Sequence, residues 1–182
     1  MAISAAMVKE LRERTGLGMM DCKKALAEAG GDMDQAIEDL RKKSSLKAAK
    51  KAGRTAANGL LGVKSSEDGT RIALVEVNIE TDFAAKNEKF IAFVSKVAQT
   101  LFDSGDMDSV PQTLNAEREI LVQEIGENMA IRRGALVESA SGGLSYYMHG
   151  DQRRGAIVQL ADKHHELGRD LAMHVVAINP MV

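Results

Sequence analysis

The chain has 182 residues, which is enough for one ordinary domain with a small one, or for two modest ones. Hydrophobic residues make up 45% and charged residues 27%, a balance typical of globular proteins and not of disordered chains. No apolar run approaches the roughly 20 residues of a membrane helix, and the N-terminus lacks the apolar region of a signal peptide. We therefore expect a cytoplasmic protein that does not act at a membrane.

The first forty residues predict three short helices. Ser4 precedes the first, which ends at Thr15-Gly16, and the second spans 18–29 with Gly30-Gly31 after it. Asp32 caps the third, with Gln35 three residues later in a capping-box relation. Helices this short bury little core, so we expect residues 1–41 to form a small docking domain. The single cysteine, Cys22, is expected to be a buried or half-buried thiol without a reactive role.

A basic run follows, in which residues 41–54 hold seven Lys or Arg and no acid. Because the net charge of the whole chain is −2, the remainder carries −9. The run could bind RNA, or it could be a solvated helix or linker between two domains. It lacks interleaved aromatic residues, so the second interpretation is favoured, and we assign 42–54 as a basic connector.

Beyond Gly59 the hydrophobic pattern changes from a helical period to an alternating one. Asp68-Gly69 is a hairpin turn signal, and the apolar alternation over 72–79 predicts a strand with one buried face. A helical pattern then runs from Ala84 to Leu101. The residues expected to pack on the sheet are Phe90, Val94, Val97 and Leu101.

The rest of the chain repeats the order of hairpin and helix. We expect a helix over 114–124, a strand over 129–137, a hairpin of 144–149 with 155–160, and a helix over 166–177 that has Leu167, Leu171 and Val175 in register. The sequence thus predicts an α+β protein in which antiparallel hairpins pack with helices. Its core divides into an N-subdomain, 55–140, and a C-subdomain, 141–182.

No catalytic signature is present: there is no phosphate-binding G-x-x-x-x-G-K loop, no G-x-S-x-G elbow and no H-E-x-x-H motif. His164 and His165 would point about 100° apart on a helix, so they cannot share a metal site with His174. We therefore expect no enzyme activity, no cofactor and no metal site.

Two groups of residues are candidates for contact with a protein partner. Thr81-Asp82-Phe83 stands where the predicted strand gives way to the helix, in a chain with only 3% aromatic residues. Asp82 or Thr81 could cap the helix, and Phe83 could fill the core or project towards a partner. Met19 and Met20 could likewise be core residues or an adaptable contact surface.

At these residues the sequence resembles bacterial translation elongation factor Ts. The family motif ELRERTGxGMMDCKKAL is matched within 10–26, the basic connector by KAAKKAGR, and VNxxTDFVAxNxxF within 77–90. GENMAIRR, YMHG and LAMHVVAINP also match family stretches, so the resemblance runs from about residue 4 to 180.

The resemblance implies a guanine nucleotide exchange factor for elongation factor Tu, a GTPase, acting by protein binding and not by covalent chemistry. The N-terminal helices would resemble a ubiquitin-associated fold and dock on the GTPase domain through Arg12, Met19 and Met20. The segment Thr81, Asp82, Phe83 and Ala84 would carry the exchange activity. Phe83 would insert between side chains of the GTPase domain, while Asp82 would help to disturb its Mg²⁺ site and phosphate loop. His149 would meet another domain of Tu.

Two departures from the family pattern accompany this resemblance. Ala84 stands where Val is common, and the chain ends where the family continues into a helical hairpin and the rest of its second core subdomain. The alternatives are an adaptor that uses the helical domain without promoting exchange, and an RNA-binding protein that uses the basic connector. No direct contact with nucleic acid is expected on the preferred interpretation.

Overall fold

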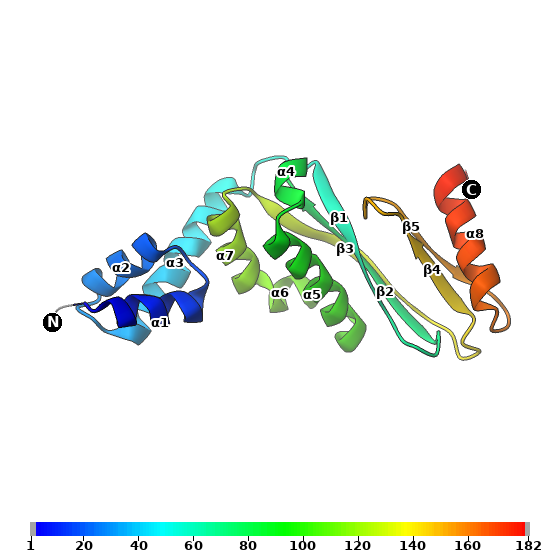
Figure 1. Cartoon of the computed structure of the whole chain (residues 1–182), viewed down its shortest axis with the longest axis horizontal. Helices are drawn as coiled ribbons and strands as arrows, with labels where there is room; N and C mark the ends of the chain where they lie inside the picture. Colours follow the sequence, from blue (N-terminus) through cyan, green and yellow to red (C-terminus); the bar gives the residue numbers. More distant parts are fainter. Residues whose placement is uncertain (1–2, 181–182) are drawn as a thin grey trace. The chain divides into compact units, whose positions relative to one another are not determined.

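The computed structural model describes residues 3–180, which divide into two compact units (Figure 1). The first unit holds the chain up to Thr55 together with Asn115–Asn128, and the second holds Ala56–Leu114 and the chain from Met129 onward. Helices and antiparallel sheets together confirm the predicted α+β class. Within residues 3–180, no helix is both long and apolar enough to cross a membrane.

The three predicted N-terminal helices are confirmed as α1 (Ala5–Thr15), α2 (Met19–Glu28) and α3 (Met33–Lys51). The Ser4 hydroxyl accepts the Met7 N–H at 3.2 Å, and the Asp32 carboxylate accepts the Gln35 N–H at 2.9 Å. These bonds satisfy backbone donors that the first turn of a helix leaves unpaired. Cys22 is fully buried, as predicted. The core of this unit comprises Val8, Leu11, Leu17, Cys22, Ala25, Leu26, Ala36 and Leu40.

Helix α3 does not end near residue 41 but continues through most of the basic run. The run holds Lys, Leu and Ala without Gly or Pro until Gly53, so helix propensity favours continuation. Helix α7 (Asn115–Ile125) packs against this extension, with Ser44 donating to the Gln123 side chain at 2.7 Å. The expected ranges 1–41, 42–54 and 55–140 therefore do not match the compact units, because α3 crosses one boundary and α7 joins the first unit.

The second unit is built on a three-stranded antiparallel sheet of β1 (Asn58–Ser65), β2 (Arg71–Ile79) and β3 (Met129–Glu138), in that order. The predicted first hairpin is confirmed, with Gly69 at φ 71° in its turn. Asp68 accepts the Thr70 N–H and hydroxyl at 3.1 and 2.7 Å. Hydrogen bonds from Ser66 and Thr70 lower the pKa of Asp68 to about 2.

The predicted helix over 84–101 is instead two helices, α4 (Asp82–Ala85) and α5 (Glu88–Ser104). Asn87 interrupts the pattern because its side chain accepts the Lys89 N–H at 2.9 Å, which makes it the N-cap of α5. The predicted packing face of α5 is confirmed. Its buried residues are Phe90, Phe93, Val94, Val97, Ala98 and Leu101. A short helix, α6 (Val110–Thr113), follows.

The predicted second hairpin and final helix are confirmed as β4 (Leu144–Met148), β5 (Gly155–Gln159) and α8 (His165–Ile178). Small residues bring α8 onto the hairpin, since a Cβ on Gly168 would lie 2.5 Å from the Ser145 hydroxyl. Gly168 and Ala172 form its buried side. The three aliphatic residues in register, Leu167, Leu171 and Val175, are 39–53% exposed.

Candidate functional site

The segment after β2 forms a short helix whose first turn is capped. Thr81 is extended, at φ −122° and ψ 158°, and its hydroxyl accepts the Ala84 N–H at 3.2 Å. Thr81 is therefore the N-cap of α4, and Asp82 occupies the first helical position. An acidic side chain there interacts favourably with the partial positive charge of the helix N-terminus.

Phe83 projects from α4 into solvent with 81% of its surface exposed. Phe90 and Phe93, a few residues later, are 0% and 1% exposed. The interpretation of Phe83 as core filling is therefore wrong. Ala84 and Ala85 are the residues that anchor α4, at 9% and 2% exposure. Position 84 thus packs against the rest of the unit with a small side chain.

Lys86 lies beside both Asp82 and Phe83. Its ammonium is 3.4 Å from the Asp82 carboxylate and 5.6 Å from the centroid of the Phe83 ring. Both contacts are exposed, so each contributes only a fraction of a kcal/mol. Their combined effect is to bias the orientations of the Asp82 and Phe83 side chains.

A cavity of about 530 Å³ lies next to α4 within the second unit. One part of its wall comes from α4, α5 and β1, and the other from the turn between β4 and β5. The lining residues are Leu60, Asp82, Ala85, Lys86, Ile91, Gly150, Asp151, Gln152 and Arg153. The structure therefore brings Asp82 and the turn that begins after His149 around one depression.

The turn after His149 is closed by its own backbone. The His149 N–H donates to the Arg154 carbonyl at 2.9 Å, and the Gln152 N–H donates to the His149 carbonyl at 2.8 Å. The Arg153 N–H donates to the Asp151 carboxylate at 3.0 Å and, with Arg154 and His149 nearby, lowers the pKa of Asp151. His149 is half-buried, and its Nδ1 lies 3.3 Å from the Tyr147 hydroxyl.

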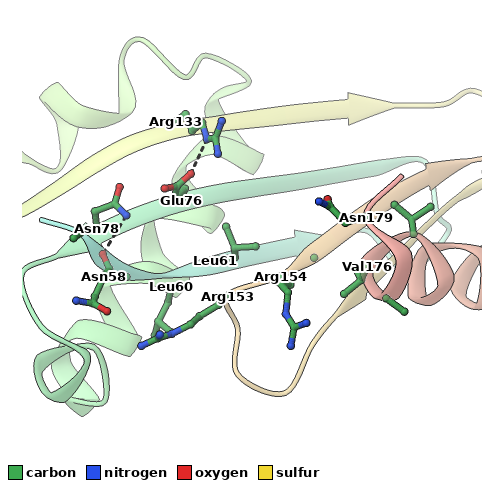
Figure 2. Close-up of a pocket in the computed structure, with 15 residues that line it drawn as sticks. Asn58, Leu60, Leu61, Glu76, Asn78, Arg133, Arg153, Arg154, Val176 and Asn179 are labelled. Atoms are coloured by element: carbon green, nitrogen blue, oxygen red, sulfur yellow. Dashed lines mark hydrogen bonds and ion pairs between the residues drawn. The ribbon is translucent and has the colours of Figure 1, made fainter. Parts of the chain in front are cut away.

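A second cavity, of about 610 Å³, opens between the three-stranded sheet and the end of α8 (Figure 2). Its sheet side carries Glu76, which pairs with Arg133 at 2.6 Å, and Asn78, which donates to the Asn58 carbonyl at 3.1 Å. Burial acts to raise the pKa of Glu76, but the hydrogen bonds from Arg133 and Asn78 outweigh it and the pKa is lowered. Sequence reasoning missed this cavity, although polar Glu76 and Asn78 on an otherwise apolar strand were its signal.

The side chains that line the two cavities are suited to binding a partner or ligand. Their polar groups are carboxylates paired with Arg or Lys, backbone and side-chain amides, and the guanidinium of Arg153, which lines both cavities. Among the described residues no group of His, Cys, Asp and Glu side chains is arranged to hold a metal ion.

The candidate contacts of the first unit lie on its surface. Met19 and Met20, at the start of α2, are 59% and 75% exposed, so neither is a core residue. Arg12 is exposed on α1. Exposed methionines side by side form a flexible apolar surface of the kind that protein partners use.

Comparison with known proteins places this chain in a family. The family described as elongation factor TS matches residues 80–182. Curated relatives named elongation factor Ts include those of Saccharophagus degradans, 53% identical over the whole chain and 64% of the relative, and Hahella chejuensis, 52% identical over 98% of the chain and 63% of the relative. A relative of the same name from Arthrospira platensis is 50% identical over the whole chain and 76% of its own length. The chain spans less than two thirds of the length of the first two relatives. It belongs to the elongation factor Ts family.

Proposed function

We propose that this protein is a guanine nucleotide exchange factor in translation elongation, which binds elongation factor Tu carrying GDP and promotes release of the GDP. The observation that carries the proposal is Phe83, an aromatic residue that is 81% exposed on a capped and anchored helix. Membership of the elongation factor Ts family supplies the partner. The protein acts through binding and catalyses no covalent step.

The mechanism is thermodynamic linkage. A protein that binds the nucleotide-free GTPase more tightly than the GDP-bound form must weaken GDP binding by the same factor. Mg²⁺ and the phosphate oxygens that it bridges provide much of the hold on GDP, so disturbing the metal is an efficient way to release the nucleotide.

Thr81, Asp82, Phe83 and Ala84 form the exchange segment on this proposal. The Phe83 ring is the wedge, because it offers a large apolar area at a low cost in conformational entropy. Thr81 and the buried Ala84 hold the ring in place before the partner arrives. Asp82 brings a negative charge to the phosphate-binding region of the GTPase, where it competes with the GDP phosphates for positive partners.

Arg12, Met19 and Met20 supply a separate docking contact on the GTPase domain. The exposure of both methionines supports this role. His149, at the entrance to the β4–β5 turn, contacts another domain of elongation factor Tu. The protein works in the cytoplasm, where its partner takes part in translation, and it requires no membrane.

The test is the release of fluorescent GDP from elongation factor Tu as a function of the concentration of this chain. We expect acceleration by the wild type and its loss with Phe83→Ala. A matched control is Leu46→Ala, which removes a 64% exposed side chain from α3, an element of the other compact unit. If the Phe83→Ala variant still accelerates GDP release, the role of Phe83 as a wedge is refuted.

The same experiment separates the adaptor alternative, for which the exposed Met19 and Met20 are the specific observation. An adaptor would bind elongation factor Tu, lose affinity with Met20→Ala, and leave the rate of GDP release unchanged. RNA binding is disfavoured, because Lys42 pairs with Glu38, Lys43 with Glu28, and Lys51 donates to the Gly126 carbonyl. A steep fall of RNA affinity with salt would favour it instead.

A further inference from the structure

Strand β1 is an edge of the three-stranded sheet, so alternate N–H groups along it point away from β2. Leu61 is one of these residues, and its N–H donates to the Gln152 carbonyl at 2.7 Å. This bond joins two segments that are about ninety residues apart in sequence, the edge strand and the β4–β5 turn. Val63 has the same orientation on β1, but its N–H has no comparable partner within residues 3–180.

Gln152 holds a backbone conformation that its residue type rarely adopts. Its φ is 53°, and Asn179 is the only other residue besides glycine with positive φ among those described. Such a conformation is strained for a residue with a Cβ, and it persists where surrounding bonds determine it. Two bonds do so here: the Gln152 N–H donates to the His149 carbonyl, and its carbonyl accepts from Leu61.

The side chain of Gln152 is exposed, so the backbone is what matters at this position. The bond to Leu61 lies beside the cavity whose wall includes Asp82 on one side and Gly150–Arg153 on the other. Figure 2 shows Arg153 of the turn close to Leu60 of β1, and both residues line that cavity. Helix α4 in turn contacts β1. Contacts and backbone hydrogen bonds therefore connect α4, through β1 and Gln152, to His149.

We propose that Gln152 is a positioning residue, which locks the β4–β5 turn onto β1. The lock makes α4 and the β4–β5 turn, with His149 at its entrance, one preorganised docking face. The inference rests on the proposed function, because it assumes that both segments contact the GTPase. A rigid face avoids the entropy loss of ordering the turn when the partner binds. Two contacts held at a fixed separation also bind as a single unit, which raises the effective affinity.

The first test needs no partner. Amide hydrogen exchange, measured residue by residue on the wild-type chain, should show Leu61 protected and Val63, its matched control on the same edge, exchanging fast. Gln152→Val should bring the exchange of Leu61 to the rate of Val63, because a β-branched residue is poorly accommodated at positive φ. Gln152→Gly, which tolerates this φ, should leave Leu61 protected.

The second test uses GDP release from elongation factor Tu. For Gln152→Val we expect the half-saturating concentration of this chain to rise about tenfold, on the scale of one strained backbone conformation. The thermal midpoint should fall by only about 2 to 4 °C, so the chain stays folded in the assay. Gln152→Gly should stay within about threefold of the wild type, since it keeps the conformation. In the Gln152→Val background, His149→Ala should have less effect than in the wild type.

The outcomes are separable. Equal exchange of the Leu61 and Val63 amides in the wild type would overturn the lock, whatever the activity. If Leu61 is protected in the wild type and exchanges fast in Gln152→Val, but the half-saturating concentration is unchanged, the role of the lock in docking would be overturned. Continued protection of Leu61 in Gln152→Val would overturn the role of Gln152 in the lock. Failure of the wild type to accelerate GDP release would overturn the proposed function and the docking role together, while the amide measurement would still decide whether Gln152 locks the turn.

Discussion

Removal of the Phe83 ring should separate function from stability. A phenylalanine side chain presents roughly 200 Å² of apolar surface, and with 81% exposed roughly 160 Å² of it remains for a partner to cover. At about 25 cal/mol per Å², full burial of that area would contribute up to about 4 kcal/mol. Because interface residues seldom reach the upper bound, we expect Phe83→Ala to weaken the productive complex by about 2 to 4 kcal/mol.

The corresponding change in folding stability should be small. Phe83 makes no core contact, so its truncation belongs to the surface substitutions that change the free energy of unfolding by less than about 0.5 kcal/mol. The assay measures fluorescent GDP release from elongation factor Tu over a range of chain concentrations, alongside urea denaturation of the variant. We expect the apparent second-order rate constant for release to fall by roughly 30- to 1000-fold, the range to which those energies correspond.

Phe83→Leu is the informative companion, because it keeps an apolar side chain without the flat ring. Intermediate activity would indicate that buried area dominates, and full loss would indicate that the shape of the ring matters. The reasoning is refuted if Phe83→Ala promotes GDP release from elongation factor Tu at the wild-type rate, or if the variant loses activity only because it unfolds.

Three further predictions concern the segments that hold this site. Thr81→Ala should destabilise α4 by about 1 kcal/mol through loss of the N-cap, which would appear as faster hydrogen exchange of the Ala84 amide, with Thr81→Ser as the control that retains the hydroxyl. Phe93→Ala should lower the free energy of unfolding by about 3 to 5 kcal/mol in urea denaturation, because this ring is 1% exposed; a loss similar to that of Phe83→Ala would contradict the assigned core. The Asp68 carboxyl should titrate near pH 2 in carbon-detected NMR. Because its pKa is below the ordinary 3.8, the stabilisation from its bonds is present above that value and is lost as pH falls through 2; a titration midpoint near 3.8 would disprove the turn geometry.

Patterns whose signal is local in the sequence predicted the elements well. The Asp68-Gly69 turn and the alternation over 72–79 located the first hairpin, and the spacing from Phe90 to Leu101 located the buried face of α5. These features depend on contacts between near neighbours and on one buried face, so periodicity carries them. Asp32 was likewise identified as a cap, and Ser4 as the residue before the first helix, because short polar side chains favour helix starts.

Element boundaries were less predictable where two local preferences compete. Asn87 lies in a helical pattern, but its side chain caps the following turn and divides α4 from α5. The basic run was compatible with either a linker or a helix, and packing against α7 stabilises the helix. That contact joins residues more than seventy positions apart, as between Ser44 and Gln123, and no local pattern encodes it.

The candidate site shows the same division between local and tertiary information. Local reasoning gave Phe83 either a core or a projecting role, and only the packing of Ala84 and Ala85 beneath α4 decides between them. The cavity beside Asp82 lies between α4 and the β4–β5 turn, and a backbone bond from Leu61 of β1 to Gln152 holds that turn. Because that bond uses no side chain, residue types at these positions are a poor guide to it.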